Sequence, residues 1–221
     1  GCVPADINYL KGLEEYCKTN GIIFILDEIV TGFRLNYGSA SSSYGLDPDL
    51  ITLGKIVGGG LPIGVVCGKK EIMQVANPVE NQNKERLCYI GGGTFSSNPL
   101  TMTAGYATLD YIGKNRKTIY KKIDKLGDMA RKGLTKLFSD YGLKVQLTGI
   151  GSVFLTHFLS NKVNEIKSAN DVALCDNQAL TRYHFSLMAK YGIFFLPHKM
   201  GAISVVHNEK DIQNLMDVTE K

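Results

Sequence analysis

The chain has 221 residues, of which 44% are hydrophobic and 21% are charged, and its formal net charge is +4. This composition is typical of globular proteins and excludes a disordered or fibrous chain, while the length suits one large domain or two smaller ones. No run approaches the roughly 18 apolar residues of a membrane span, so no membrane partner is expected. The sequence opens with Gly1 rather than Met, which suggests that it begins within a longer protein.

Basic residues and cysteines narrow the range of partners. Lysines and arginines are densest between residues 114 and 125, in what reads as one helix. A solvated helix face and a nucleic-acid patch both fit this stretch, and the first is favoured, so no nucleic-acid partner is expected. The five cysteines are scattered, odd in number and form no CxxC pair. Neither disulfides nor a metal site are indicated, and a reducing cytoplasm fits best.

The first part of the chain alternates between helical and strand patterns. Asp6 or Asn8 can cap a helix whose apolar residues recur at steps of three or four, and Asn20-Gly21 ends it. Three apolar runs then predict strands, at residues 22–26, 50–53 and 63–67. The first run has no polar alternation, which is typical of a parallel strand buried on both faces. Residues 33–48, rich in Gly, Ser and Tyr, predict a loop.

The second part of the chain begins with long helical patterns. One helix is predicted to start at Asn98-Pro99 and another to cover residues 118–138. Further strands are predicted at residues 145–147, 152–158, 193–196 and 202–206, with helices over 171–191 and after Asn208. These patterns predict an α/β domain over residues 1–110, followed by a smaller α+β domain over 111–221.

Asp27 and Lys55 each follow the end of a predicted strand. Ligands of open parallel sheets bind at the carboxyl ends of the strands, so both side chains would face one crevice if the strands are neighbours. An internal ion pair is a second interpretation, although burying such a pair seldom stabilises a protein. Gly54 and the glycines 58–60 leave room for a molecule to approach, and a partly desolvated lysine can attack a carbonyl group. An aldehyde cofactor would explain Asp27 too, because a pyridinium nitrogen needs a carboxylate partner.

Six blocks of the sequence resemble one known family. They are CVP (2–4), LDEIVTGFR (26–34), YGLDPDLITLGKIVGGGLPIGVVCGKKEIM (44–73), GTFSSNP (93–99), TAGYATL (103–109) and VVHNEKDI (205–212). In this order they are similar to the class III, fold type I, pyridoxal-phosphate aminotransferases, and among them to the glutamate-1-semialdehyde 2,1-aminomutases. The resemblance implies part of the large, mostly parallel α/β cofactor domain, followed by a small α+β C-terminal domain.

The resemblance also implies roles for single residues. Lys55 matches the lysine that forms a Schiff base with pyridoxal 5'-phosphate and moves the proton, and Asp27 matches the carboxylate on the pyridine nitrogen. Ile29 falls where the family packs an aliphatic side chain on the cofactor ring. Thr94 matches the threonine that reaches the cofactor phosphate of the neighbouring subunit, so a homodimer with shared sites is implied. Glu28 has no such role and is expected to be a structural hydrogen-bonding residue.

The sequence does not identify the substrate. Arg34, with nearby tyrosines, has the guanidinium fork that suits a substrate carboxylate, but it is also interpretable as a surface loop residue. Lys199 stands in a segment, 198–200, where the aminomutase pattern has an acid, so it is a second candidate contact. Family members are about twice as long, and the half with the main phosphate-binding loop has no counterpart here. The open functions are an aminomutase acting on a small amino substrate, a class III transaminase with a 2-oxo acid or aldehyde acceptor, and a non-catalytic fragment or partner chain.

Overall fold

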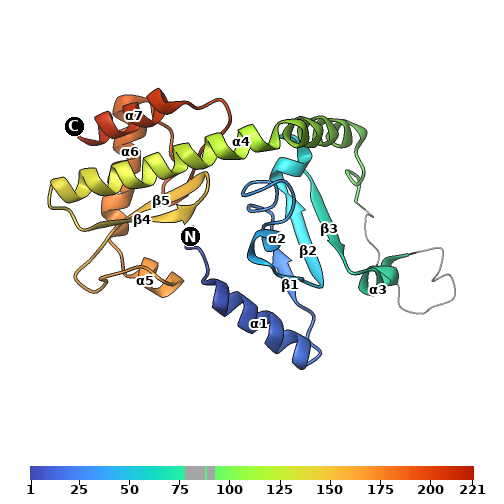
Figure 1. Cartoon of the computed structure of the whole chain (residues 1–221). Coiled ribbons are helices and arrows are strands. Elements are labelled where there is room, and N and C mark those ends of the chain that lie inside the picture. Colours follow the sequence, from blue (N-terminus) through green and yellow to red (C-terminus); the bar gives the residue numbers. More distant parts are fainter. Residues whose placement is uncertain (78–87, 89–92) are drawn as a thin grey trace. The chain divides into compact units, whose positions relative to one another are not determined.

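The computed structural model describes residues 1–77, 88 and 93–221. They form two compact units: the N-terminal unit, Ala5–Arg116, and the C-terminal unit, Lys117–Lys221 together with Gly1–Pro4. Each unit contains one three-stranded sheet (Figure 1). The boundary expected near residue 110 lies within a helix that runs through both units, and the roles assigned to the ranges 1–110 and 111–221 stay a prediction.

The N-terminal unit is built around a sheet with the strand order β1-β2-β3. Its elements are α1 (Ile7–Thr19), β1 (Ile25–Asp27), α2 (Ala40–Tyr44), β2 (Leu50–Gly54), the 3-10 helix η1 (Lys55–Gly58), β3 (Gly64–Gly68), α3 (Lys70–Met73), the 3-10 helix η2 (Gln74–Ala76) and the first part of α4 (Pro99–Asp140). Strands β1 and β2 are parallel, whereas β2 and β3 are antiparallel. Of the two predicted caps of α1, Asp6 and Asn8, the structure has Asp6, whose carboxylate accepts hydrogen bonds from two backbone N–H groups of the first turn. The strands predicted over 50–53 and 63–67 are confirmed to within one residue.

Strand β1 differs from its prediction. The run 22–26 was expected to be a strand buried on both faces, but only Ile25–Asp27 form β1, and Ile22, Ile23 and Ile25 are about half exposed. Within the part of the chain that the structure describes, β1 is an edge strand that pairs with β2 alone, and of this run only Phe24 is buried there. The prediction is wrong here because an unbroken apolar run indicates a strand that has cover on both faces, and the described residues do not supply it.

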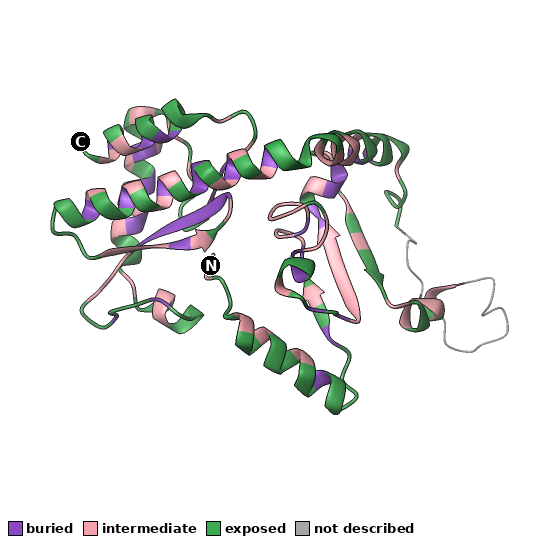
Figure 2. Ribbon diagram, in the orientation of Figure 1, coloured by how far each residue is buried: buried purple, intermediate pink, exposed green. Residues whose placement is uncertain are grey.

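The C-terminal unit packs helices onto an antiparallel sheet with the order β4-β5-β6. Its elements are the rest of α4, β4 (Val145–Ile150), β5 (Val153–Phe158), α5 (Ala169–Ala173), α6 (Asn177–Tyr191), β6 (Gly201–Ala202) and α7 (Glu209–Thr219). Its core, purple in Figure 2, joins α4, β5, α6 and α7. The core residues are Leu126, Ala130, Leu134, Phe138, Phe154, Leu187, Ile203, Ile212, Leu215 and Val218.

The two helices predicted over residues 98–138 are one helix, α4, of 42 residues. No proline interrupts it, and a single glycine such as Gly113 costs only about 1 kcal/mol in a helix interior, which packing overrides. Its buried residues Ile119, Ile123, Leu126 and Ala130 recur at steps of three or four, so one apolar stripe continues into the core. The prediction of two separate helices is therefore wrong.

Two more predictions for the C-terminal unit need correction. The helix expected over 171–191 is divided into α5 and α6, because the carboxylate of Asp176 caps a new helix by accepting from the Ala179 N–H. Residues 193–196 form no strand, and of 202–206 only Ala202 lies in one. The Ile193 N–H instead bonds the Leu187 carbonyl and closes α6. The helix after Asn208 is confirmed as α7.

A buried histidine makes the stability of the C-terminal unit depend on pH. His157 is 2% exposed, its Nε2 lies 2.9 Å from the Thr148 hydroxyl, and burial lowers its pKa to about 4. As the pH falls below 6.5, this histidine takes up a proton in the unfolded chain before it does so in the folded protein. The contribution of neutral His157 to the free energy of unfolding is therefore fully present above pH 6.5 and is lost as the pH falls toward 4. We expect a loss of about 3 kcal/mol over this range, measured by urea unfolding. His157→Gln, which does not titrate, should flatten the slope; an unchanged slope would refute the assignment.

Candidate functional site

Asp27 and Lys55 lie at the carboxyl ends of neighbouring parallel strands, as the sequence predicted. β1 ends at Asp27, which lies opposite Thr52 of β2. β2 ends at Gly54, and Lys55 follows directly. The lysine backbone is thus three residues, or about 10 Å of strand, beyond the point opposite Asp27, within reach of one small ligand. Both side chains are exposed.

The Asp27 carboxylate is held by one of its two oxygens. Oδ1 accepts hydrogen bonds from the Ile29 N–H, over 2.9 Å, and from the Thr52 hydroxyl, over 3.2 Å. No hydrogen bond or ion pair to Oδ2 occurs among the residues that the structure describes. One oxygen is therefore fixed, and the other is available to an external donor.

Glu28 faces the other way and is structural, as expected. It is 3% exposed, and its carboxylate accepts hydrogen bonds from the Ser39 hydroxyl at 2.8 Å, the Ser41 N–H at 2.9 Å and the Ala40 N–H. These donors begin α2. The side chain thus ties the end of β1 to α2, a short helix inside the range 33–48 where the sequence predicted only a loop, and the adjacent acids have separate tasks.

Two glycines near Lys55, Gly54 and Gly59, are packed against different parts of the N-terminal unit. A Cβ on Gly54 would lie 3.2 Å from Cγ2 of Ile29, so the Ile29 side chain packs over the residue before Lys55. A Cβ on Gly59 would lie 2.3 Å from the Ala104 carbonyl oxygen of α4, and Gly59 has a φ of +61°. The sequence interpretation that a ligand approaches glycines 58–60 is thus wrong for Gly59, which α4 approaches instead.

Lys55 has a strained backbone. Its φ of +50° is in the left-handed region, which costs a non-glycine residue about 1–2 kcal/mol. Among the described residues, the non-glycine residues with positive φ are Cys2, Phe33, Lys55, Ser97 and His198. Phe33 and His198 directly precede the predicted site residues Arg34 and Lys199. Strained residues gather at functional sites, where the surrounding structure holds them.

This strain predicts an unusual order of stability for variants at position 55. Lys55→Gly should be more stable than Lys55→Ala by about 1 kcal/mol, because glycine adopts a positive φ without a steric penalty. At Lys11, exposed inside α1, the order should reverse by a similar amount. Urea unfolding of the four variants provides the comparison. Equal stabilities at position 55 would show that the left-handed conformation costs nothing there.

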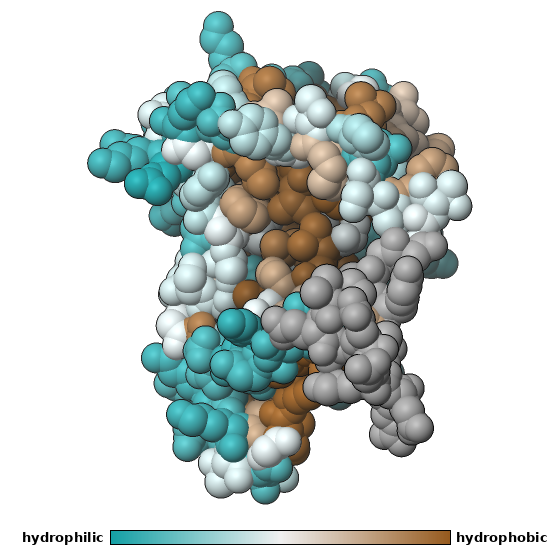
Figure 3. Space-filling view, turned by 90° about the vertical axis from the view of Figure 1, so that its right-hand side faces the viewer, coloured by the Kyte–Doolittle hydropathy of each residue, from teal (hydrophilic) through white to brown (hydrophobic). Residues whose placement is uncertain are grey.

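Thr94 lies beside a separate hollow of the N-terminal unit. This hollow of about 680 Å³ is bordered by β3, by the turn before α4 and by the first turn of α4. Its lining residues are Pro62, Ile63, Gly64, Val65, Val66, Gly93, Thr94, Phe95, Ser96, Ser97, Asn98, Thr101 and Met102. Phe95 of this lining is 82% exposed, and Leu100 and Tyr106 of α4 are 69% and 74% exposed. Figure 3 draws one face of the molecule, on which apolar surface gathers in a central band. Asp27 and Lys55 do not line this hollow.

The two predicted substrate contacts lie in different units. Arg34 is half-buried in the turn after β1, where its N–H bonds the Thr31 carbonyl. Lys199 is exposed in the C-terminal unit, and its N–H bonds the Leu196 carbonyl. The preceding residue, His198, has its Nε2 2.8 Å from the Thr181 hydroxyl. Contacts of Arg34 and Lys199 with a substrate stay predictions.

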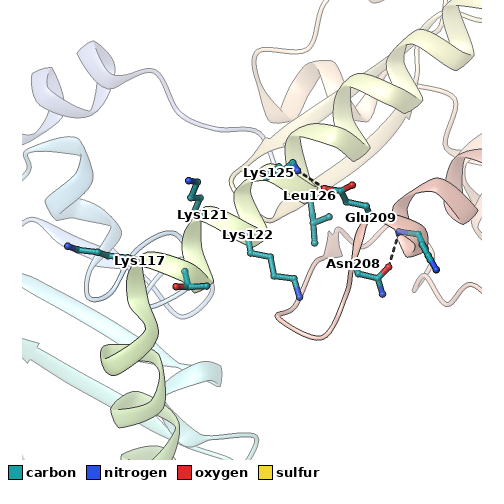
Figure 4. A pocket seen from close by; sticks show the side chains of 9 residues that line it. Lys117, Lys121, Lys122, Lys125, Leu126, Asn208 and Glu209 are labelled. Carbon is teal, nitrogen blue, oxygen red and sulfur yellow. Dashed lines mark hydrogen bonds and ion pairs between the residues drawn. The ribbon is translucent and has the colours of Figure 1, made fainter.

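The basic stretch of α4 lines a hollow of about 910 Å³ in the C-terminal unit (Figure 4). Lys125 forms a 2.5 Å ion pair with Glu209 of α7, and the Lys122 ammonium donates to the Val205 carbonyl over 2.5 Å. These contacts tie α4 to the segment that begins α7. The choice between a solvated helix face and a nucleic-acid patch stays a prediction. No helix within the described ranges has the length and hydropathy needed to cross a bilayer.

Comparison with known proteins gives the family. The family model described as aminotransferase class III matches residues 1–206. The chain belongs to the class III aminotransferases. Among curated relatives of this class III aminotransferase chain, glutamate-1-semialdehyde 2,1-aminomutase 2 of Lachnoclostridium phytofermentans is 36% identical over 100% of the chain and 50% of the relative. The aminomutase of Methanothermobacter thermautotrophicus is 34% identical, with the same coverage.

Solved structures share the fold. An omega-transaminase from Sphaerobacter thermophilus has a TM-score of 0.83 and 32% identity, and the match covers 100% of this chain and 48% of that one. A glutamate-1-semialdehyde aminomutase from Pseudomonas aeruginosa has a TM-score of 0.83 at 20% identity, which shows the fold alone. The class III aminotransferase fold predicted from the sequence is confirmed. The chain spans about half the length of the curated relatives it matches.

The residues present suit the cofactor that the family implies. A ring N–H donor finds Oδ2 of Asp27, which has no hydrogen bond to any described residue, and an aldehyde finds an exposed primary amine at Lys55. The sequence named Asp27 and Lys55 as candidates for the cofactor site, and the family resemblance added Ile29 and Thr94; their roles stay predictions. The sequence missed Thr52, whose hydroxyl bonds Asp27, because only the register of β1 and β2 shows that the two residues lie opposite each other.

Proposed function

We propose that the protein containing this chain transfers amino groups with pyridoxal phosphate, as the glutamate-1-semialdehyde 2,1-aminomutases do. The observation that carries the proposal is the placement of Asp27 and Lys55 at adjacent parallel strand ends, with Oδ2 of Asp27 available. Identities of 34–36% with aminomutases over the whole chain support it. The cytoplasm is part of the proposal, since the five cysteines are free.

Asp27, Lys55 and Ile29 would each have a different role in this reaction. When bound, pyridoxal phosphate supplies an aldehyde that condenses with amines and a ring that accepts an electron pair. Asp27 Oδ2 would accept a hydrogen bond from the ring N–H and keep that nitrogen protonated. Lys55, released by the substrate amine, would move a proton between the substrate carbon and the cofactor carbon. Ile29, packed over Gly54, would shield the ring from water.

Chemical trapping tests the role of Lys55. The complete protein is loaded with pyridoxal phosphate and reduced with borohydride, and the labelled peptide is mapped. We expect the label on Lys55, its loss in Lys55→Ala and its retention in Lys70→Ala, which removes an exposed lysine of α3. A label on any other lysine would refute the assignment. If the protein dimerises but takes up no cofactor, the non-catalytic alternative replaces the proposal.

A transaminase is the second candidate, favoured by the basic segment at Lys199 and by the 32% identity with an omega-transaminase. An aminomutase moves the amino group within one molecule, whereas a transaminase needs a second molecule as acceptor. Conversion of glutamate semialdehyde without a 2-oxo acid or aldehyde acceptor therefore decides for the aminomutase. Conversion of other amino donors only when such an acceptor is added decides for the transaminase.

Thr94 is proposed to serve the cofactor phosphate of the partner subunit in a homodimer. Its exposure, in a hollow separate from Asp27 and Lys55, supports this arrangement. Complementation is the test: Lys55→Ala and Thr94→Ala chains, each inactive alone, are expressed together. If Thr94 acts across the interface, mixed dimers hold one intact site, and about a quarter of the normal activity returns. No recovery would mean that Thr94 acts within its own subunit.

A further inference from the structure

We infer that Thr52 is a positioning residue for Asp27, an inference that rests on the proposed function. The Thr52 hydroxyl donates a hydrogen bond to Oδ1 of Asp27 over 3.2 Å. The parallel register of β1 and β2 places the two residues directly opposite each other. Thr52 would thereby determine which oxygen of the carboxylate meets the ring nitrogen.

Fixing the orientation of the Asp27 carboxylate requires two hydrogen-bond donors to the same oxygen. The torsion that turns an aspartate carboxylate is broad and roughly two-fold, so its oxygens exchange readily unless something holds one of them. The Ile29 N–H, two residues along the chain, reaches Oδ1 at 2.9 Å. A single local bond of this kind still permits rotation about its own direction. The second bond, from the neighbouring strand, fixes the plane of the carboxylate and leaves Oδ2 free.

The backbone of Thr52 performs a separate task. Its carbonyl oxygen accepts a hydrogen bond of 2.9 Å from the Glu28 N–H, which holds the turn after β1. This bond does not depend on the side chain. Thr52→Val keeps the β-branched shape that suits a strand and removes only the hydroxyl, so it tests the contact with Asp27 alone.

The experiment compares Thr52→Val with Thr52→Ser and with Thr103→Val. Thr103 is an exposed residue of α4 whose hydroxyl bonds the Pro99 carbonyl over 2.8 Å, far along the chain from Asp27. For the holoenzyme we expect Thr52→Val to lower kcat about tenfold while KM for the amino donor stays within about twofold. The Kd of pyridoxal phosphate, followed by tyrosine fluorescence in the protein without cofactor, should rise about fivefold. Thr52→Ser should restore both values to within about threefold of the original protein, and Thr103→Val should change neither.

Two results would overturn the inference. One is a Thr52→Val protein that matches Thr103→Val in both kcat and Kd. The other is a Thr52→Ser protein as impaired as Thr52→Val, since the defect would then come from the strand and not from the hydroxyl. If Lys55 takes no borohydride label in the original protein, the proposed function and the inference fail together. If Lys55 is labelled and either result above is found, the inference alone fails.

Discussion

Asp27→Ala is expected to lower kcat/KM for amino transfer by about 1,000-fold, because it removes the carboxylate that would keep the ring nitrogen protonated. Asp27→Asn should lower kcat/KM nearly as much. Its amide oxygen can still take the place of Oδ1, but the side chain carries no negative charge. The side chain is exposed, so neither substitution should reduce stability by more than about 1 kcal/mol. Steady-state kinetics at saturating cofactor and urea unfolding measure the two effects.

Asp47→Ala is the matched control for this prediction. Asp47 is also an exposed aspartate of the N-terminal unit, and it pairs with Lys69 at 3.3 Å instead of facing the strand ends. We expect its kcat/KM to stay within about twofold of the original protein, because exposed ion pairs contribute little. An Asp27→Ala protein that kept a tenth or more of the activity would show that another group holds the ring nitrogen.

Glu28→Ala is expected to destabilise the N-terminal unit by about 4 kcal/mol. The substitution removes a buried carboxylate and leaves the Ser39 hydroxyl and two backbone N–H groups at the start of α2 without their acceptor. Each buried donor left without a partner costs about 1–3 kcal/mol. Glu28→Gln, which keeps one acceptor oxygen, should lose about half as much. Urea unfolding gives both values.

Glu15→Ala provides the comparison for Glu28. Glu15 is exposed on α1, so its removal should change stability by no more than about 0.5 kcal/mol. A loss below about 1 kcal/mol for Glu28→Ala would mean that water replaces the carboxylate at α2. Glu28 would then not be the residue that holds the loop after β1.

The parts of the site that the sequence predicted depend on local signals. An apolar run followed by Asp27, and another followed by Gly54-Lys55, place both side chains at strand ends because a short strand stops where its apolar run stops. The cap at Asp6 follows from chemistry within one helical turn. The family resemblance then supplied the roles that spacing alone left open between an ion pair and a cofactor site.

The parts that the sequence could not predict depend on contacts between distant residues. The pairing of Asp27 with Thr52 requires the register of two strands, which neither strand encodes by itself. Gly59 looks like a position kept clear for a ligand until the Ala104 carbonyl is found against it. The left-handed backbone of Lys55 has no sequence signal at all, since its neighbours impose it on a residue that disfavours it.

The exposed edge of β1 also has a consequence for handling the protein. Within the described residues β1 forms hydrogen bonds to one neighbouring strand, so the backbone groups on its other side can pair with a strand of another molecule. Ile22, Ile23 and Ile25 add exposed hydrophobic side chains to this edge. A polypeptide limited to these 221 residues is therefore prone to aggregate during refolding. Covering that edge, by further sequence or by a solubilising partner, is the precondition for recovering it as a homogeneous sample.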